Sequence, residues 1–103
     1  MKTFSIKSYI DKMQNLSSAG KALYNDVFSL IGQPDKIILD FQGTTGIATL
    51  FLNTSLGDLM DIFGVEKIKK TFKYTNIQRS QVERIQKYFA DYEAVNLKDV
   101  ESS

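Results

Sequence analysis

The sequence contains no histidine, no cysteine and no tryptophan, and it contains a single proline. The absence of cysteine excludes disulfides, thiolate zinc sites and thiol nucleophiles, and the absence of histidine removes the commonest general base and transition-metal ligand. Any catalysis would have to depend on Ser, Thr, Lys, Tyr, Asp and Glu. We therefore expect a protein that has no metal site, no cofactor and no catalytic residues, and that is not an enzyme.

Long hydrophobic runs are also missing. The first residues, MKTFSIKSYIDKM, interrupt their apolar positions with Lys, Ser and Asp, so they form no signal-peptide core. No apolar stretch approaches the length of a membrane span. We therefore expect a cytoplasmic protein that does not interact with membranes.

Charges of the two signs nearly balance, because 13 Lys and Arg stand against 12 Asp and Glu. Such a balance argues against a surface built wholly for nucleic acid or anionic lipid. The distribution is uneven, since residues 66–88 hold seven basic and two acidic side chains, whereas residues 91–101 hold one basic and four acidic. A nucleic-acid-binding accessory protein that uses residues 66–88 therefore stays open as the alternative function.

The basic segment can also be interpreted without a polyanion. Its basic side chains are Lys67, Lys69, Lys70, Lys73, Arg79, Arg84 and Lys87, with Phe72, Tyr74 and Tyr88 between them. The aromatic residues could stack on single-stranded bases, but their spacing fits core positions better. The lysines fit the solvated edge of a sheet.

A length of 103 residues with 43% hydrophobic content is typical of one small domain with a single core. We place the domain at residues 1–95 and a polar C-terminal tail at residues 96–103. Alternation of apolar and polar residues predicts strands, and apolar residues three and four apart predict helices. The predicted strands span residues 2–7 (at an edge), 36–41 (buried on both faces) and 65–77. The predicted helices span 19–31 with Ser17 or Ser18 as N-cap, a segment from about Thr49 to Gly64, and about 80–92; residues 8–18 fit a loop or a short helical turn.

This order of strands and helices predicts a single small α/β domain with at least some parallel strands. We expect a mixed sheet of about four strands, with the strand at 36–41 in its centre and helices packed on one face. Function in such sheets usually lies in the loops that leave the carboxyl ends of the strands. The candidate region is therefore Asp40–Thr49.

Polar residues in this region allow more than one role. Asp40 has no histidine or second acid nearby, which makes it a poor cation site, so a strand end hydrogen-bonded to loop amides is favoured. Thr44, Thr45 and Thr49 place hydroxyls around the start of the next helix, where they could cap the helix or carry a phosphate. The sequence SSAGKA at 17–22 lacks the flanking Gly and the following hydroxyl of a phosphate-binding loop, so a helix N-terminus is the better interpretation.

Residues 36–60, KIILDFQGTTGIATLFLNTSLGDLM, resemble the STAS-like family, which is related to the sulfate transporter and anti-sigma-factor antagonist domain. Asp40 and Phe41 match the Asp-Phe end of the family's strand. The triplet Phe-Leu-Asn at 51–53 and the following Gly57 match the next part of its pattern. The segments GKALYNDVF and YTNI are also similar, so the resemblance spans about residues 15–95.

The resemblance implies a regulatory module that binds a protein partner. Better-studied antagonists of this fold bind an anti-sigma kinase, are phosphorylated on Ser or Thr at the N-terminus of the helix after the central strand, and lose binding when modified. STAS-like proteins are also commonly associated with histidine-kinase-like ATPases. Carried onto this sequence, the phosphosite falls near Ala48 or Thr49, although the antagonists' Asp-Ser pair reads Ala-Thr here.

The expected contact surface is the loop from Gln42 to Thr49 together with the start of the following helix, where Asn53 could contribute. The candidate partner-binding residues are Asp40, Thr44, Thr45, Thr49 and Asn53, and the candidate phosphosite is Thr49. A homodimer, formed through the lysine-edged strand or the second helix, is a further prediction.

Overall fold

The computed structural model describes the backbone of residues 2–102 and the side chains of residues 2–95. Three strands form one sheet in the order β1-β2-β3, and both neighbouring pairs are parallel. The strands are β1 (Lys2–Ser5), β2 (Ile37–Asp40) and β3 (Phe72–Thr75). The helices are α1 (Ile6–Lys12), α2 (Leu16–Phe28), α3 (Thr49–Leu52), the π-helical segment η1 (Asn53–Gly57), α4 (Asp58–Phe63), α5 (Val65–Thr71) and α6 (Arg79–Ser102).

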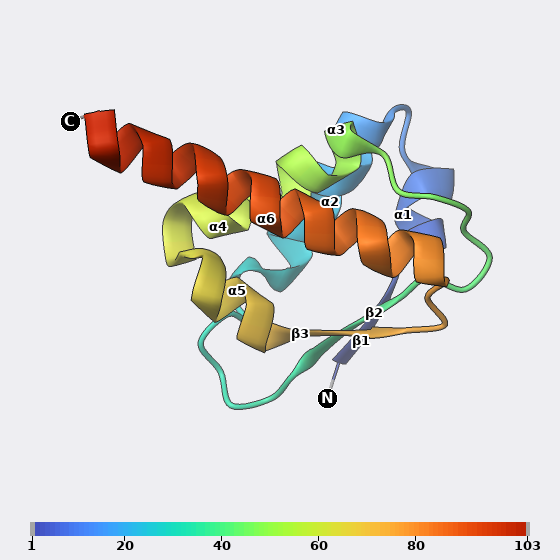
Figure 1. Ribbon diagram of the computed structural model, residues 1–103. Coiled ribbons are helices and arrows are strands. Elements are labelled where there is room, and N and C mark those ends of the chain that lie inside the picture. Colours follow the sequence, from blue (N-terminus) through green and yellow to red (C-terminus); the bar gives the residue numbers. More distant parts are fainter. Residues whose placement is uncertain (1, 103) are drawn as a thin grey trace.

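All helices gather on one side of the sheet (Figure 1). Strands that are added in one direction through right-handed crossovers place both sets of connecting helices on the same face. In β2, Ile37 and Leu39 point to that face and are 1% exposed, whereas Ile38 and Asp40 point to the opposite face and are half-exposed. The predictions of a central strand and of helices on one face are confirmed. The prediction that this strand is buried on both faces is wrong.

The predicted mixed sheet of about four strands is also wrong, because the residues described here form three strands, all of them parallel. Each connection between consecutive strands contains helices and returns the chain to the end of the sheet where it started, which makes the next strand parallel. An antiparallel strand would need a connection, such as a hairpin, that stays at the end of the sheet where the previous strand finished. The small α/β domain itself is confirmed.

The segment 65–77, predicted as one strand, is divided between α5 and β3. Val65 and Ile68 are three residues apart, which suits one face of a helix, and Ile68 is fully buried. Glu66 in the first turn and Lys69 in the last turn oppose the charges of the helix ends. Only the four residues of β3 keep the predicted alternation, with Phe72 buried and its neighbour exposed.

The remaining helices differ from prediction mainly at their ends. The N-cap of α2 is Asn15, whose side chain accepts a hydrogen bond from the Ser18 amide at 2.8 Å, and not Ser17 or Ser18. The predicted helix that ends at Gly64 is present as three consecutive segments, α3, η1 and α4. The short helical turn allowed for residues 8–18 is α1, which begins directly after β1.

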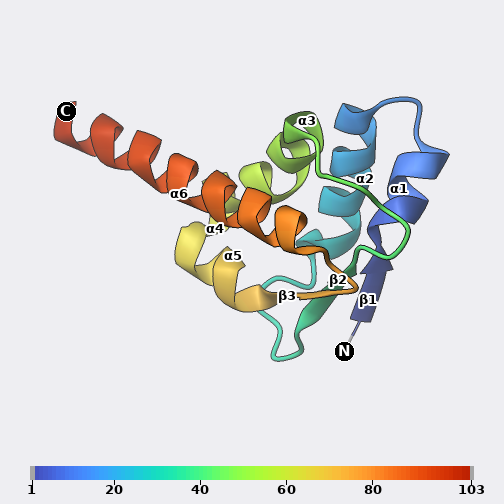
Figure 2. The same cartoon turned by 45° about the vertical axis from the view of Figure 1, so that its right-hand side comes forward.

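The last helix, α6, is much longer than the predicted 80–92. It crosses the front of the domain and projects beyond it (Figure 2). Its backbone stays helical to Ser102, into the segment 96–103 that was predicted as a polar tail, but the side chains of that segment lie outside the described part of the structure. Within the residues described, no helix is long and apolar enough to cross a membrane.

The core lies between the covered face of the sheet and the helices. On the helical side, α2 packs closely against the α3–η1 segment. The hydroxyl of Thr54 donates a hydrogen bond to the carbonyl of Ser17 on α2 at 2.8 Å. Gly20 makes this approach possible, because a Cβ atom at that position would collide with the Thr54 hydroxyl and the Phe51 carbonyl. A backbone carbonyl cannot move aside as a flexible side chain can, so glycine is required here.

We therefore expect Gly20→Ala to destabilise the protein by about 1–3 kcal/mol, as overpacked cores do. In an unhindered helix the same substitution is stabilising by up to about 1 kcal/mol, so the sign of the effect is diagnostic. Urea unfolding followed by circular dichroism measures the change. Asn25→Ala, at an exposed position of the same helix, is the control and should change the free energy of unfolding by less than about 0.5 kcal/mol. Equal or greater stability of Gly20→Ala would contradict the packing described.

Candidate functional site

One buried side chain, that of Gln81 in the first turn of α6, is hydrogen-bonded to the loop that follows β2. Gln81 is fully buried, and its Nε2 donates to the Thr44 hydroxyl at 2.8 Å and to the Gly46 carbonyl at 3.0 Å. Its Oε1 accepts from the Gln78 amide at 3.0 Å. The carboxamide thus uses both its donor and its acceptor groups, as a buried polar group must.

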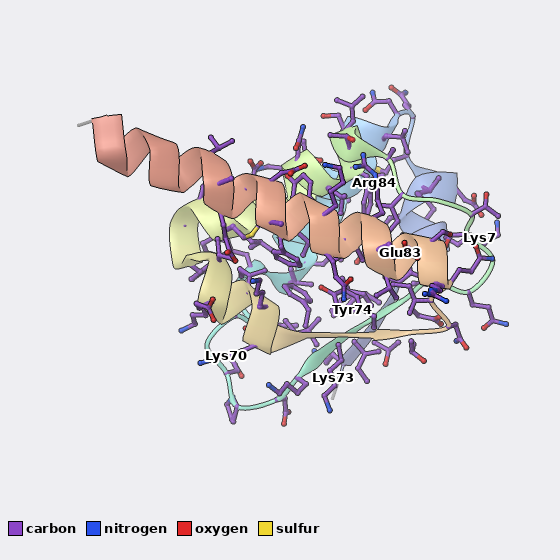
Figure 3. The ribbon with its side chains drawn as sticks, in the orientation of Figure 1. Lys7, Lys70, Lys73, Tyr74, Glu83 and Arg84 are labelled. Atoms are coloured by element: carbon purple, nitrogen blue, oxygen red, sulfur yellow. The ribbon has the colours of Figure 1, made fainter. Side chains whose placement is uncertain are left out.

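A second residue of α6, Arg84, contacts the far end of this loop. Its Nε donates to the Ile47 carbonyl at 3.4 Å, and its Nη2 donates to the hydroxyl of Thr49. Figure 3 shows Arg84 on the side of α6 that faces α3. The loop is therefore attached to α6 at both of its ends.

The three candidate threonines have different environments. Thr44 is half-buried, donates to the Phe41 carbonyl at 2.6 Å and accepts from Gln81, so its hydroxyl is fully used inside the loop. Thr45 and Thr49 are exposed. None of them caps the following helix, because the N-cap position of α3 is Ala48 and no side chain makes a cap hydrogen bond there. The capping role that was predicted as an alternative for these threonines is therefore wrong.

Asp40 lies at the end of β2 and is hydrogen-bonded to its neighbours. Its Oδ1 accepts from the side-chain amide of Asn76 at 3.0 Å and from the backbone amide of Gln42 at 3.0 Å. The Asn76 hydrogen bond, followed by that of the Gln42 amide, lowers the pKa of the Asp40 carboxyl. This is the strand-end role that the sequence favoured. Asp40 points to the open face of the sheet and does not line the groove that contains Thr49.

Thr49 and Asn53, both predicted as candidates, line one groove of about 380 Å³ between the α3–η1 segment and α6. The Tyr88 hydroxyl donates to Asn53 Oδ1 at 2.7 Å across this groove. Gly57, one turn further along η1, leaves room for the Tyr88 hydroxyl, which a Cβ atom would meet. Burial is the main cause that raises the pKa of the Tyr88 hydroxyl, and the negative charge of Asp58 is the second. The hydroxyl therefore stays protonated and remains a donor. π-Helical segments such as η1 are frequent at functional sites.

The basic segment 66–88 does not form a single free surface. Three of its seven basic side chains form ion pairs with acidic side chains. The nitrogen–oxygen distances are 2.5 Å for Lys69 and Glu93, 3.4 Å for Arg79 and Glu83, and 3.0 Å for Lys87 and Asp91. Arg84 binds the loop, and Figure 3 shows it across α6 from Lys70 and Lys73. Phe72 is buried and Tyr74 half-buried, so these rings belong to the core and not to an exposed stacking surface.

Sequence reasoning missed the residues of α6 that organise the site. Arg84 and Tyr88 were assigned to the basic segment, and Gln81 was not singled out. One signal existed: Gln81 is four residues before Ile85 and eight before Phe89, so a polar residue occupies the apolar stripe of the helix. Its partners in the loop could not be identified, because they lie 35 to 37 residues earlier in the chain. Among the side chains described, no cluster of acids could hold a metal ion.

We expect Gln81→Ala to lower the free energy of unfolding by about 2 kcal/mol or more, because it leaves buried donors and acceptors without partners. Gln86→Ala, on the exposed side of the same helix, is the matched control and should have little effect. Hydrogen exchange of the loop amides, including that of Thr44, should accelerate only in the Gln81 variant. Unchanged exchange there would show that α6 does not hold the loop.

The lowered pKa of Asp40 predicts a pH-dependent contribution to stability. A carboxyl whose pKa is lower in the folded state stabilises the fold at pH values above its unfolded pKa of about 3.9, and this contribution is lost as the pH falls through the folded pKa. Asp40→Asn keeps an acceptor but removes the charge. Urea unfolding should show wild type to be the more stable at about pH 7, with the difference shrinking as the pH falls below about 3.9 and vanishing below the folded pKa. A difference that persists at low pH would contradict this assignment.

Comparisons with known proteins identify the family of this chain. A family model described as a STAS-like domain of unknown function (DUF4325) matches residues 19–82, which include most of α2, then β2, the candidate loop, β3 and Gln81. No curated protein matches the chain. No solved structure matches it either. Because the family model covers more than half of its length, the chain belongs to the STAS-like family.

Proposed function

We propose that this protein is a regulatory module that binds a protein partner through the loop 42–49 and the adjoining groove. The observation that carries the proposal is the attachment of this loop to α6 by Gln81 and Arg84, while Thr45, Thr49 and Asn53 remain exposed. A loop that is already ordered loses little conformational freedom on binding, which favours affinity. Membership of the STAS-like family supports the same role.

We further propose that phosphorylation of Thr49 regulates this surface. The Thr49 hydroxyl is exposed and already in contact with the Arg84 guanidinium. A phosphate adds about −1.5 to −2 charges and forms strong, charge-assisted hydrogen bonds with arginine. Because Arg84 also binds the Ile47 carbonyl, a phosphate on Thr49 would compete for that guanidinium and loosen the end of the loop.

The proposed partner is a histidine-kinase-like ATPase, by analogy with the better-studied antagonists that the sequence resembles. The proposed mechanism is binding without catalysis. Asp40 is the acid nearest in sequence to the loop, and its lowered pKa makes it a weak general base at neutral pH. The nucleic-acid alternative receives less support, since its basic side chains do not share one face: Arg84 binds the loop and lies across α6 from Lys70 and Lys73.

Quantitative affinity capture from a cell extract tests the proposal with three baits: wild type, Thr49→Glu and Thr49→Val. We expect wild type and Thr49→Val to retain a common ATPase, and Thr49→Glu to retain at least about fivefold less of it, because the added charge pairs with Arg84 and draws it away from the Ile47 carbonyl. Mass spectrometry of the wild-type bait should also detect phosphate on Thr49. Equal recovery by all three baits would contradict the switch, and the absence of any common partner would contradict the module.

A matched substitution distinguishes the effect of the Arg84 contact from the effect of a negative charge anywhere on the loop. Thr45 is exposed in the same loop, and no basic side chain contacts it among the hydrogen bonds of the described residues. Thr45→Glu therefore adds the same charge without an Arg84 contact. We expect Thr45→Glu to retain more partner than Thr49→Glu; the reverse order would assign the effect to charge on the loop in general.

A further inference from the structure

The groove of Thr49 has a regular floor. Every fourth residue of one stripe of α6 is hydrogen-bonded to the helical segments opposite, with Arg84 bound to Thr49, Tyr88 to Asn53 at 2.7 Å, and Tyr92 to Asp61. Side chains at this spacing lie on one face of a helix. From Arg84 to Tyr92 the stripe extends about 12 Å along the helix axis. A partner in this groove therefore meets about two turns of α6.

The two ends of the groove carry opposite charges. At one end, Arg84 is half-exposed and lines the groove, and its Nη1 makes no hydrogen bond within the described residues. At the other end, Asp58 and Asp61 of α4 take part in none of the ion pairs of the described side chains. Both carboxylates lie near Tyr88, because their charges raise its pKa in addition to the larger effect of burial.

The middle of the groove is electrically neutral. Asp91 also lines the groove, but Lys87 forms an ion pair with it at 3.0 Å. A partner segment therefore meets a positive charge beside the loop 42–49 and an excess of negative charge about two helical turns away.

Exposed apolar side chains flank the same groove. Three of the large apolar side chains described are more than half exposed, namely Val95 (59%), Leu50 (58%) and Ile62 (54%). Val95 lines the groove, Leu50 follows Thr49 on α3, and Ile62 follows Asp61 on α4. Apolar side chains exposed around one site are typical of protein–protein interfaces.

We propose that the partner, whose existence rests on the proposed function, places an amphipathic helix of about three turns in this groove. An acidic side chain of that helix binds Arg84. A Lys or Arg about two turns away faces Asp58 and Asp61, and the apolar side chains between them contact Val95 and its apolar neighbours. Complementary charges at the two ends fix the direction in which the partner helix lies.

An extended peptide or a polyanion fits the groove less well. The walls of the groove are the helical segments α3, η1, α4 and α6, which offer no strand edge to an extended backbone. A helix satisfies its own backbone hydrogen bonds and needs none from the groove. A nucleic acid would bind Arg84 but would be repelled by Asp58 and Asp61.

The same arrangement connects the partner helix to the proposed phosphorylation. The acidic side chain of the partner and a phosphate on Thr49 require the same guanidinium, that of Arg84. A phosphate on Thr49 would bind Arg84 within the chain and displace this end of the partner helix.

The probe for this site is a library of random peptides of about 16 residues displayed on phage. The library is selected in parallel on wild type, Arg84→Glu and Asp58→Lys. We expect peptides from wild type to share an acidic residue and a Lys or Arg about seven or eight positions apart, with apolar residues between them at helical spacing. Peptides from Arg84→Glu should carry Lys or Arg in place of the acidic residue, and those from Asp58→Lys should lose the basic one.

Fluorescence anisotropy with the most enriched wild-type peptide gives the size of each effect. Asp58→Lys should weaken binding by about fivefold, and Arg84→Glu by about tenfold or more. Glu83→Lys is the matched control: it changes the net charge as much as Asp58→Lys, but Glu83 is paired with Arg79 and does not line the groove. Its affinity should stay within about twofold of wild type.

A charge swap separates the proposed contact from a loss of folding. The same peptide with Lys in place of its acidic residue should bind Arg84→Glu more tightly than it binds wild type, because the two charges are exchanged and the pair is restored. Equal or weaker binding to Arg84→Glu would overturn the contact.

Three other results would overturn the proposal. The first is a selection without a shared pattern, and the second is a shared pattern that is unchanged on Arg84→Glu and Asp58→Lys. The third is a dimer in sedimentation equilibrium that Val95→Glu dissociates, which would identify a second copy of the chain as the occupant. Capture of an ATPase together with peptides that lack the charge pattern would leave the proposed function standing and reject the partner helix alone.

Discussion

The buried carboxamide of Gln81 joins the start of α6 to the loop that follows β2, and the position of the rest of α6 depends on this link. Its partners are the Thr44 hydroxyl and two backbone groups. If the loop or the helix moved, these buried polar atoms would lose their hydrogen bonds, and water could not replace the lost partners. The link fixes α6 at its first turn. The direction of the helix then brings Arg84 to the end of the loop and Tyr88 to Asn53, while Ile85 and Phe89 enter the core.

The residues by which the sequence resembles the family have physical reasons in this chain. Gly20 permits the contact between α2 and the α3–η1 segment, and Gly57 permits the approach of Tyr88. Asn53 accepts the hydrogen bond of that same tyrosine. The family match ends at residue 82, so it includes Gln81 but not Arg84 or Tyr88. The anchor of α6 therefore lies within the family's region, whereas the side chains that α6 presents to the groove of Thr49 lie beyond it.

Sequence patterns located the central strand and the candidate loop because both depend on neighbouring residues. The run KIILDF predicts a strand from local composition, and the glycines after it predict a loop. Local patterns predicted the wrong element where the same residues fit both the period of a helix and the period of a strand. Val65, Ile68 and Phe72 suit a helix by their spacing, and the lysines between them also suit the outer face of a strand. Packing decided in favour of α5, which buries Ile68 completely. Burial of β2 on one face only follows from the direction of both crossovers, which no local pattern encodes.

By itself, the sequence determined the class of the domain and the position of its central strand, indicated Thr49 and Asn53 as candidates, and excluded thiol and imidazole chemistry through its lack of cysteine and histidine. These depend on residue types and on intervals of a few positions. Only the tertiary structure decided that Thr44 is used internally, that Asp40 faces away from the groove of Thr49, and that Tyr74 has a buried hydroxyl. The physical reason is that these outcomes depend on how separate segments pack; for example, Asn76 lies 36 residues after Asp40, and Gln81 lies 37 residues after Thr44. Hydrogen-bond partners at such separations are selected by tertiary packing, and no local sequence pattern identifies them.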